Sequence, residues 1–453
     1  MQRSNDATGE ADLIAKVAEA KTASLQLAMA PAVTKNRALK RVAESITSER
    51  DALIAANEKD MGAAMALIEQ GKMSRALASR LKLDDSKIDE ISRMVESVAA
   101  LDDPVGKVTY SIKMDEHMDL FKLTVPFGVI AAVFEARPDA LPQIASLCVK
   151  SGNAVILKGG SEALQSNRVM HSIIAEALVA EGIPKGSTQL IEGREAVSML
   201  LKMDGMVDLI IPRGSNEFVK FIQDNTRIPV IGHSSGICHI FVDRSADQEK
   251  AVEICFDARV QYPAACNSMK VLLIDSSVAP SLLPSIAARL IEGGVRLRCC
   301  PRAKNILESR GIAVERASAT DWVTEYLEPT LPVKLVDGID EAIAHINCYG
   351  CRHTDAIITE DRDAAKKFLR MVDSSSVIHN ASTRFSDGYR YGLGAEVGIS
   401  TNKVHARGPV GLEGLVTTKF VLFGAGQTVI DYVGKNAKPF LHQRSGVEIN
   451  GRY

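Results

Sequence analysis

The feature that most constrains this chain is an alternation of short apolar runs with amphipathic segments, which begins near residue 128. The runs lie at Gly128–Phe134, Ala154–Leu157, Thr188–Ile191 and Val207–Ile211, and the segments between them are long enough for helices. Near-continuous apolar strands between helices are typical of a parallel sheet that is covered on both faces. The sequence therefore predicts a doubly wound α/β domain.

A second alternation of the same kind runs from about Ile240 to Val416. Its apolar runs include Val271–Ile274, Lys334–Val336, Ala356–Ile358 and Ser376–Ile378. By the same argument, this region predicts a second α/β domain.

Three other segments differ from this pattern. Between Asp12 and Ala100 apolar residues recur at helical spacing in a sequence rich in Ala, Leu, Lys and Glu, which predicts a helical layer. Alternating residues at Val108–Leu120 predict a protruding β-hairpin, and Phe420–Phe423 predicts one more strand.

Composition and charge exclude several classes of protein. The 453 residues include 54 basic and 56 acidic side chains, so no net charge attracts the chain to nucleic acid or to an anionic membrane. No apolar stretch reaches the roughly 18 residues that span a bilayer, and acidic residues within Met1–Ala20 do not fit a secretory signal. Eight scattered cysteines do not suggest a disulfide framework. We expect a cytoplasmic protein.

Two glycine-containing turns follow predicted strands of the first α/β domain. The turn at 158–161 follows Ala154–Leu157, and the turn at 212–216 follows Asp208–Ile211. Glycine permits close approach of the backbone, and a helix N-terminus offers free N–H groups, so such turns suit a nucleotide. The alternative is that the glycines only reverse the chain. The candidate cofactor-binding residues are Lys158, Gly159, Gly160, Ser161, Gly214 and Ser215.

The charge at the first turn bears on the choice of dinucleotide. A site for NAD usually places an acidic residue on the adenosine ribose, whereas the 2′-phosphate of NADP requires a cation. Lys158 and Ser161 occupy the turn, although Glu162 comes next in the chain. These residues favour NADP over NAD.

A cysteine lies in a short loop of small residues ahead of the strand Val271–Ile274, where residues 262–270 read YPAACNSMK. A thiolate at Cys266 would be the best nucleophile of the chain, and Asn267 or nearby backbone N–H groups would stabilise an oxyanion. The alternative is that Cys266 is a small buried hydrophobic residue, as most cysteines are.

One further pattern imitates a metal site. His345, Cys348, Cys351 and His353 have the spacing His-x2-Cys-x2-Cys-x-His, which is similar to that of a zinc knuckle. An amphipathic helix over the first half spreads these side chains over different faces. We therefore expect no metal.

Basic and amide side chains gather at 379–385 and 405–409. Solvated loop charges are the default explanation, but a small anionic substrate would need one or two guanidinium groups in a closed site. The candidates for substrate binding are Arg137, Asn380, Arg384 and Arg407.

Several segments together resemble one family. The strings FGVI at 127–130, FEARPD at 134–139, LKGG at 157–160 and IPRGS at 211–215 are similar to those of the γ-glutamyl phosphate reductases, also called glutamate-5-semialdehyde dehydrogenases. The strings GHS at 232–234, YPAACN at 262–267 and RGPVGLEG at 407–414, with the segment 336–357, extend the resemblance over nearly the whole chain. The chain most resembles the reductase half of the bifunctional pyrroline-carboxylate synthases.

The resemblance implies an aldehyde-dehydrogenase-like α/β fold, with two doubly wound Rossmann-like domains and a small β-hairpin oligomerisation arm. The NADP-binding domain would comprise residues 1–106 and 127–238, and the catalytic domain with Cys266 would comprise residues 239–416. Residues 107–126 and 417–453 would form the arm. Such an arm implies a homo-oligomer, either a dimer or a tetramer.

The resemblance also implies a reaction, the NADPH-dependent reduction of L-glutamyl 5-phosphate to L-glutamate 5-semialdehyde in proline biosynthesis. Cys266 would displace phosphate to form a thioester, which hydride then reduces. A separate glutamate 5-kinase would supply the substrate. Glu325 corresponds to the glutamate that binds the nicotinamide ribose in the superfamily, and His233, in the GHS string, joins the candidates for substrate binding.

Alternatives and departures from the family remain. No glutamate at 229–236 could serve as a base for thioester hydrolysis, which argues against a hydrolytic aldehyde dehydrogenase. A CoA-acylating reductase and an inactive nucleotide-binding protein stay open. Lys270 stands where the family usually has an acidic residue, and Cys351 stands where it usually has a small hydroxyl residue.

Overall fold

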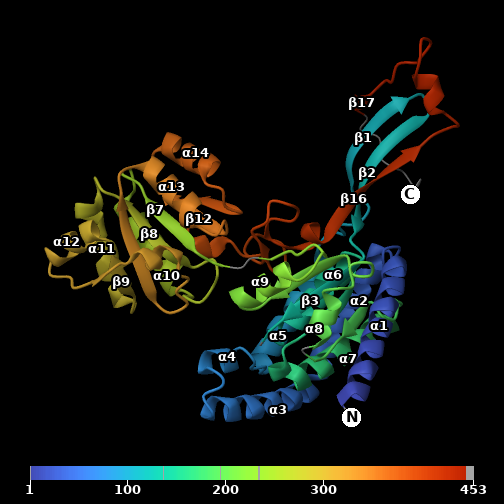
Figure 1. The fold of residues 1–453 in the computed structure, drawn as a ribbon, viewed down its shortest axis with the longest axis horizontal. Coiled ribbons are helices and arrows are strands. Elements are labelled where there is room, and N and C mark those ends of the chain that lie inside the picture. The colour runs from blue at the N-terminus through green and yellow to red at the C-terminus, as the bar shows by residue number, and fades with distance from the viewer. Residues whose placement is uncertain (1, 136, 194, 233–234, 445–453) are drawn as a thin grey trace. The chain divides into compact units, whose positions relative to one another are not determined.

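The computed structural model describes residues 2–135, 137–193, 195–232 and 235–444 (Figure 1). The chain divides into two compact units. Unit 1 comprises residues 1–214, 224–230 and 411–453, and unit 2 comprises residues 215–223 and 231–410. Within the described part of the chain, no helix is both long enough and apolar enough to cross a membrane.

Unit 1 contains a four-stranded parallel sheet with the strand order β5-β4-β3-β6. Every residue of the central strand β3 is buried, because helices cover both faces of the sheet. The four strands lie where the apolar runs predicted them, which confirms the first α/β domain. The strands are β3 (Val129–Phe134), β4 (Ala154–Lys158), β5 (Thr188–Leu190) and β6 (Leu209–Arg213).

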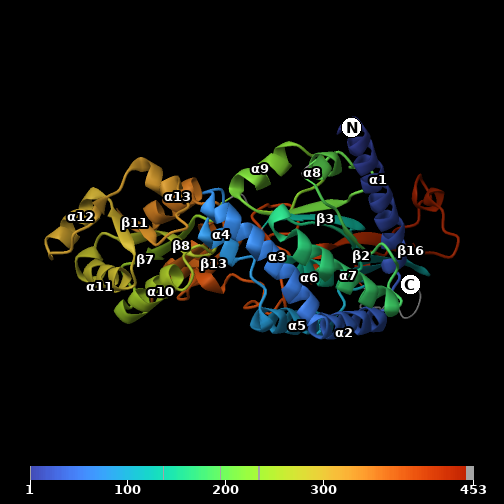
Figure 2. The same cartoon turned by 90° about the horizontal axis from the view of Figure 1, so that it is seen from below.

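Helices α1 and α8 lie on one face of this sheet, and α6 and α7 lie on the other (Figure 2). Helices α2, α3 and α5 pack against α6 and α7 and form the predicted helical layer. The bounds are α1 (Gln2–Leu27), α2 (Ala32–Ser48), α3 (Arg50–Glu69), α4 (Arg75–Ser79), α5 (Asp85–Ala100), α6 (Ala140–Lys150), α7 (Leu164–Ala180) and α8 (Glu195–Leu200).

A buried carboxylate on α3 fixes the start of α7. Asp60 accepts hydrogen bonds from the backbone N–H groups of Gln165 and Ser166 at 3.1 and 2.8 Å, and from Ser166 Oγ at 2.7 Å. The first N–H groups of a helix have no acceptor within the helix and are stabilised by a negative charge. The helical layer thereby holds the helix that follows the turn at 158–161.

A separate antiparallel sheet has the strand order β16-β2-β1-β17 (Figure 1). Strands β2 and β16 pair along their length, from Pro126 opposite Val416 to Asp119 opposite Phe423. The predicted hairpin and the predicted late strand therefore belong to one sheet. The strands are β1 (Val108–Asp115), β2 (Met118–Pro126), β16 (Val416–Phe423) and β17 (Gln443–Arg444).

Unit 2 contains a seven-stranded parallel sheet with the order β10-β9-β11-β8-β7-β12-β13. Neighbouring residues of β7 enter different cores: Ile240 and Val242 pack with residues of α10, α11 and α12, whereas Phe241 packs with residues of α13 and α14. Both faces of the sheet are thus apolar, which confirms the second α/β domain.

The strands of this sheet are β7 (Cys238–Val242), β8 (Met269–Asp275), β9 (Arg296–Cys299), β10 (Glu315–Arg316), β11 (Thr330–Val336), β12 (Thr354–Ile358) and β13 (Ser376–His379). The helices of unit 2 are α9 (Asn216–Asp224, whose last residue falls in unit 1), α10 (Gln248–Val260), α11 (Ala279–Glu292), α12 (Pro301–Glu308), α13 (Ile339–Tyr349) and α14 (Arg362–Met371). Strands β14 (Ile399–Ser400) and β15 (Gly408–Pro409) form a small antiparallel pair.

The observed boundary between the units differs from the predicted one at 238/239. Residues from Ile231 onward cluster with unit 2, as do residues 215–223. The physical reason at the first boundary is that β7 already begins at Cys238 and that Gly236 lies against the backbone of Cys266. The segments expected to form the arm cluster with unit 1.

We expect Asp60→Ala to lower the free energy of unfolding by about 2 kcal/mol, because two N–H groups and a hydroxyl lose a charged acceptor in a buried place. Urea unfolding followed by circular dichroism measures this change. Glu58→Ala removes an exposed carboxylate from the same helix and should change the free energy by less than about 0.5 kcal/mol. Equal effects of the two variants would contradict the assigned role of Asp60.

Candidate active site

Cys266 lies at the corner of a turn between α10 and β8 in unit 2. The Ala265 N–H donates to the Tyr262 carbonyl at 3.1 Å, and the Ser268 N–H donates to the Ala265 carbonyl at 3.1 Å. The Cys266 side chain is half-buried and is not in a disulfide. A thiol placed in this way can be reached by a small molecule.

Two segments approach the backbone of Cys266 closely. A Cβ atom at Gly236 would lie 2.6 Å from the Cys266 carbonyl oxygen and 2.6 Å from Glu325 Oε1. Only glycine fits at position 236, and its small size brings the Glu325 carboxylate close to the backbone of the cysteine. The thiol of Cys238 donates to the Cys266 carbonyl at 3.1 Å.

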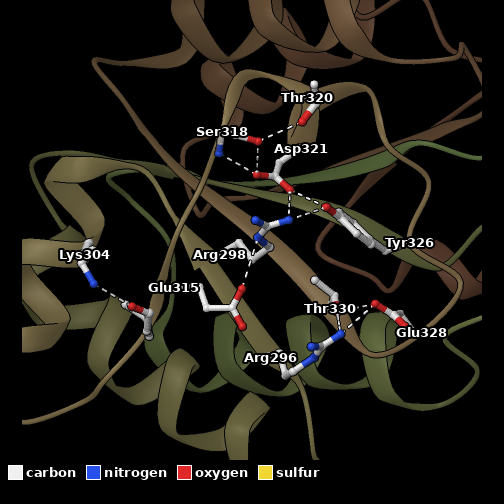
Figure 3. A network of polar contacts seen from close by, with 11 residues as sticks. Arg296, Arg298, Lys304, Glu315, Ser318, Thr320, Asp321, Tyr326, Glu328 and Thr330 are labelled. Atoms are coloured by element: carbon white, nitrogen blue, oxygen red, sulfur yellow. Dashed lines mark hydrogen bonds and ion pairs between the residues drawn. The ribbon is translucent and has the colours of Figure 1, made fainter.

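The segment that contains Glu325 is held by a polar network (Figure 3). Arg298 Nη1 donates to Asp321 Oδ1 at 2.7 Å and to the hydroxyl of Tyr326 at 2.8 Å. Asp321 is fully buried. Desolvation by burial is the largest single effect and would raise its pKa, but hydrogen bonds from Ser318 and Tyr326 and the positive charge of Arg298 together lower the pKa. The network fixes the chain on both sides of Glu325.

A buried arginine connects this segment to β8. Arg259 is fully buried and donates to the carbonyls of Met269 at 3.1 Å, Thr330 at 2.9 Å and Glu328. Burial lowers its pKa to about 10. Asn216 in turn donates to Glu325 Oε2 at 3.0 Å, so the carboxylate itself has a fixed orientation.

Arg384 lies beside the cysteine loop. Its guanidinium is 5.9 Å from the centre of the Tyr262 ring, and its Nε donates to Gln261 Oε1 at 2.8 Å. The side chain is largely buried, and burial lowers its pKa. The structure thus brings one of the arginines selected from the sequence to the loop that contains Cys266.

The amide of Asn267 already has one partner in the loop after β13. The side chain is buried, and its Nδ2 donates to the Ser386 carbonyl at 2.7 Å. This bond fastens the loop to the segment after β13. The geometry therefore favours backbone N–H groups over the Asn267 amide as donors to an oxyanion.

Two other candidates have structural partners. Asn380 accepts from the Thr359 N–H and donates to the Thr359 carbonyl, both at 2.9 Å. Arg407 Nη2 donates to Asp373 Oδ1 at 3.0 Å. Both side chains thus have partners within unit 2, and their roles in substrate binding stay predictions.

The remaining substrate candidates lie elsewhere. Arg137 follows β3 in unit 1, is nearly half exposed, and has its Nη2 3.5 Å from Asp139 Oδ2. His233 lies outside the described residues.

The two glycine-containing turns follow β4 and β6 at the same edge of the unit 1 sheet, because both strands run parallel to β3. A Cβ atom at Gly159 would overlap the side-chain amide of Asn167 on α7, so only glycine allows this close packing. The carboxylate of Glu162 lies over Gly160, and Lys158 ends β4. The turn thus has one cation and one acid beside it, and the acid covers Gly160 in this structure.

The turn after β6 leads into α9, where Gly214 precedes Ser215. The Phe218 N–H donates to Ser215 Oγ at 3.3 Å, so Ser215 caps the first turn of that helix.

The histidines and cysteines with zinc-like spacing have other surroundings. His345 and His353 are buried, whereas Cys348 is exposed. Cys351 accepts a hydrogen bond from the Ile237 N–H at 3.0 Å, and His345 Nδ1 lies 3.1 Å from Lys334 Nζ. Over the ranges that the structure describes, no group of three or more His, Cys, Asp or Glu side chains could hold a metal ion.

Sequence reasoning gave no role to Gly236, Cys238 and Arg259. The first two lie in the string GICH at 236–239, which shows no chemistry of its own. Nothing in the sequence marks Arg259, because an arginine on an amphipathic helix is usually solvated.

Comparison with known proteins identifies similar sequences and structures. A profile of the aldehyde dehydrogenase family matches residues 3–296. The gamma-glutamyl phosphate reductase of Methanosarcina acetivorans is 52% identical over 435 residues, which cover 96% of this chain and 97% of that protein. The crystal structure of the gamma-glutamyl phosphate reductase of Thermotoga maritima superimposes with a TM-score of 0.87 at 39% identity, covering 92% of this chain and 99% of that one.

An acetylating aldehyde dehydrogenase of Geobacillus thermoglucosidasius shares the fold at 19% identity, with a TM-score of 0.65 and coverage of 93% of this chain and 98% of that chain.

We expect iodoacetamide at about pH 8 to label Cys266 and Cys348 in the folded protein and to spare Cys148, Cys255 and Cys299. Burial raises the pKa of all three spared thiols, that of Cys299 to about 12, so they stay protonated while only thiolates react. Peptide mapping by mass spectrometry locates the label. All of these cysteines should react in urea, and rapid labelling of Cys255 in the folded protein would refute the expected order.

Proposed function

This chain belongs to the gamma-glutamyl phosphate reductases of the aldehyde dehydrogenase family and catalyses the reductase step of proline biosynthesis, and we propose that it does so with NADPH and through a thioester on Cys266. The observation that supports the thioester is the position of Cys266. Its half-buried thiol stands at the corner of a turn that is fastened by Cys238 and Asn267.

In the first step, the Cys266 thiolate attacks the acyl carbon of L-glutamyl 5-phosphate, a C–S bond forms, and phosphate leaves with the electrons of the C–O bond. The carbonyl oxygen becomes an oxyanion during the attack. The backbone N–H groups of Cys266 and Asn267 are the donors nearest in sequence to the Cys266 thiol, and they stabilise the charge of the oxyanion.

Two sets of residues, each described within its own unit, suit parts of a dinucleotide. The turn at Gly159 and Gly160 would bind the pyrophosphate once the Glu162 carboxylate moves off Gly160, and Lys158 supplies a cation for the 2′-phosphate of NADP. The oriented carboxylate of Glu325 suits the hydroxyl groups of the nicotinamide ribose. When bound, the nicotinamide supplies the hydride that reduces the thioester.

During the reduction, the same two N–H groups hold the oxyanion on the acyl carbon. When the C–S bond breaks, Cys266 leaves as a thiolate and glutamate 5-semialdehyde is released. No glutamate stands within residues 229–236 to activate water, so the thioester persists until it is reduced.

For the substrate's own charges we propose Arg384. Arg384 lies beside the Cys266 loop, and its largely buried guanidinium would bind a carboxylate or phosphate in a place of low dielectric constant. A separate glutamate 5-kinase would supply the substrate in the cytoplasm. A homo-oligomer held by the β1, β2 and β16 arm completes the proposal.

The test is the reverse reaction, oxidation of glutamate 5-semialdehyde with NADP, followed by absorbance in the presence and absence of phosphate. We expect the wild type to require phosphate and Cys266→Ala to be inactive, because phosphate must attack the thioester to release the acyl group. Cys348→Ala, which removes the exposed thiol, is the matched control and should keep full activity. Activity without phosphate would indicate hydrolysis, and a requirement for CoA would indicate another acyl carrier.

Lys158→Ala should raise the KM for NADP about 10-fold, because the variant loses one charge-assisted hydrogen bond to the 2′-phosphate. The KM for NAD, which has no 2′-phosphate, should stay within about twofold. Steady-state kinetics with both dinucleotides measures this difference. Lys185→Ala, at a highly exposed lysine of unit 1, should change neither value. An equal rise in both KM values would contradict the proposed contact between Lys158 and the 2′-phosphate.

A further inference from the structure

A lysine is completely buried beneath the Cys266 loop. Lys270, on β8, has no exposed surface, and its Nζ donates to the carbonyls of Pro263 at 2.5 Å and Ala265 at 3.0 Å. It forms no ion pair within the described ranges of the chain. Burial, together with the charge of Arg259, lowers its pKa to about 8. A lysine so placed is costly, and its contacts are with the loop that contains the nucleophile.

The two bonds from Lys270 determine how a peptide plane is oriented. In a trans peptide the C=O and N–H point in opposite directions. Because the Ala265 carbonyl points toward Lys270, the N–H of the same peptide, that of Cys266, points away from Lys270.

The next peptide is oriented in the same manner by a different donor. The Cys238 thiol donates to the Cys266 carbonyl at 3.1 Å, so the N–H of Asn267 points away from Cys238. Neither N–H has a hydrogen-bond acceptor among the residues that the structure describes. Both N–H groups are therefore left available to donate to an anion.

We propose that Lys270 is a positioning residue, which holds the Ala265–Cys266 peptide so that the Cys266 N–H meets the oxyanion of the reaction. This inference rests on the proposed thioester chemistry, because only an acyl transfer at Cys266 creates that oxyanion. Lys270 touches the loop and not the substrate.

The turn does not need Lys270 in order to form. The hydrogen bond from the Ser268 N–H to the Ala265 carbonyl closes it, and the Asn267 side chain fastens it to Ser386. Lys270 adds a second, charged donor to a carbonyl that is already bonded. Its contribution is therefore the precise orientation of one peptide rather than the existence of the loop.

Two variants separate orientation from folding. Lys270→Met keeps the length of the side chain and removes the charge and the donors, whereas Lys270→Gln keeps one amide donor. Lys334→Met is the matched control, because Lys334 is a half-buried lysine on β11, next to β8 in the same sheet. Each variant is first checked by circular dichroism and by its melting temperature.

Two rates are then compared for each folded variant. The first is kcat of the phosphate-dependent oxidation of glutamate 5-semialdehyde, which passes through tetrahedral oxyanions. The second is the alkylation of Cys266 by iodoacetamide at its high-pH plateau, a displacement at a CH2 group that forms no oxyanion. A role in holding the oxyanion donor affects only the first rate.

For Lys270→Met we expect kcat to fall between about 10-fold and 100-fold, with KM within about twofold and plateau alkylation within about threefold of the wild type. Lys334→Met should leave both rates unchanged. A folded Lys270→Met or Lys270→Gln variant with wild-type kcat would overturn the proposal. So would a parallel loss of alkylation, or a failure of both variants to fold, since either result makes Lys270 merely structural.

The failure of the proposed function gives a different result. If Cys266→Ala keeps phosphate-dependent activity, the thioester is wrong whatever the Lys270 variants do. If Cys266→Ala is inactive and the folded Lys270 variants behave as the wild type, only the role of Lys270 is wrong.

Discussion

The candidate site depends on two buried cations whose partners are backbone carbonyls. Arg259 holds the carbonyls that follow Glu325, and Lys270 holds those that precede Cys266. No carboxylate forms an ion pair with either cation in the part of the chain that the structure describes. A carbonyl dipole neutralises a charge only when it points at it, so neither loop can turn away without leaving a charge unsolvated in the protein. The thiol and the carboxylate are thereby kept in fixed positions within unit 2.

Much of the fold could be predicted from the sequence because parallel strands that are buried on both faces must be apolar. Ile240, Phe241 and Val242 are all buried, although they enter different cores, so the run has no polar interruption. Strand β17 could not be predicted in this way, because Gln443 and Arg444 are exposed and form a strand only by pairing with β1. The pairing of β2 with β16 joins distant parts of the sequence and leaves no local signal. The boundary between the compact units also depends on contacts that leave no local signal, such as those of Gly236 with Cys266 and of Ile237 with Cys351.

The site residues divide in the same way. Cys266 and the glycines at 159 and 160 could be selected from the sequence because their neighbours are small and the chain turns there. Asn380 and Arg407 were selected by side-chain type alone. Side-chain type does not show that Asn380 is hydrogen-bonded to Thr359 or that Arg407 is paired with Asp373. The role of Arg259 could not be predicted, because its partners are backbone carbonyls, which residues of any type possess.

The contacts of Lys270 also constrain how this position can be exchanged between relatives. The resemblance led us to expect an acidic residue at 270, and a carboxylate there would face the carbonyl oxygens of Pro263 and Ala265. Oxygen facing oxygen is repulsive unless the acid carries a proton or the peptide is turned over. The observed conformation of the loop before Cys266 therefore depends on a hydrogen-bond donor at position 270. An acidic residue introduced at 270 alone would have to be protonated, or the Ala265–Cys266 peptide would have to change its orientation.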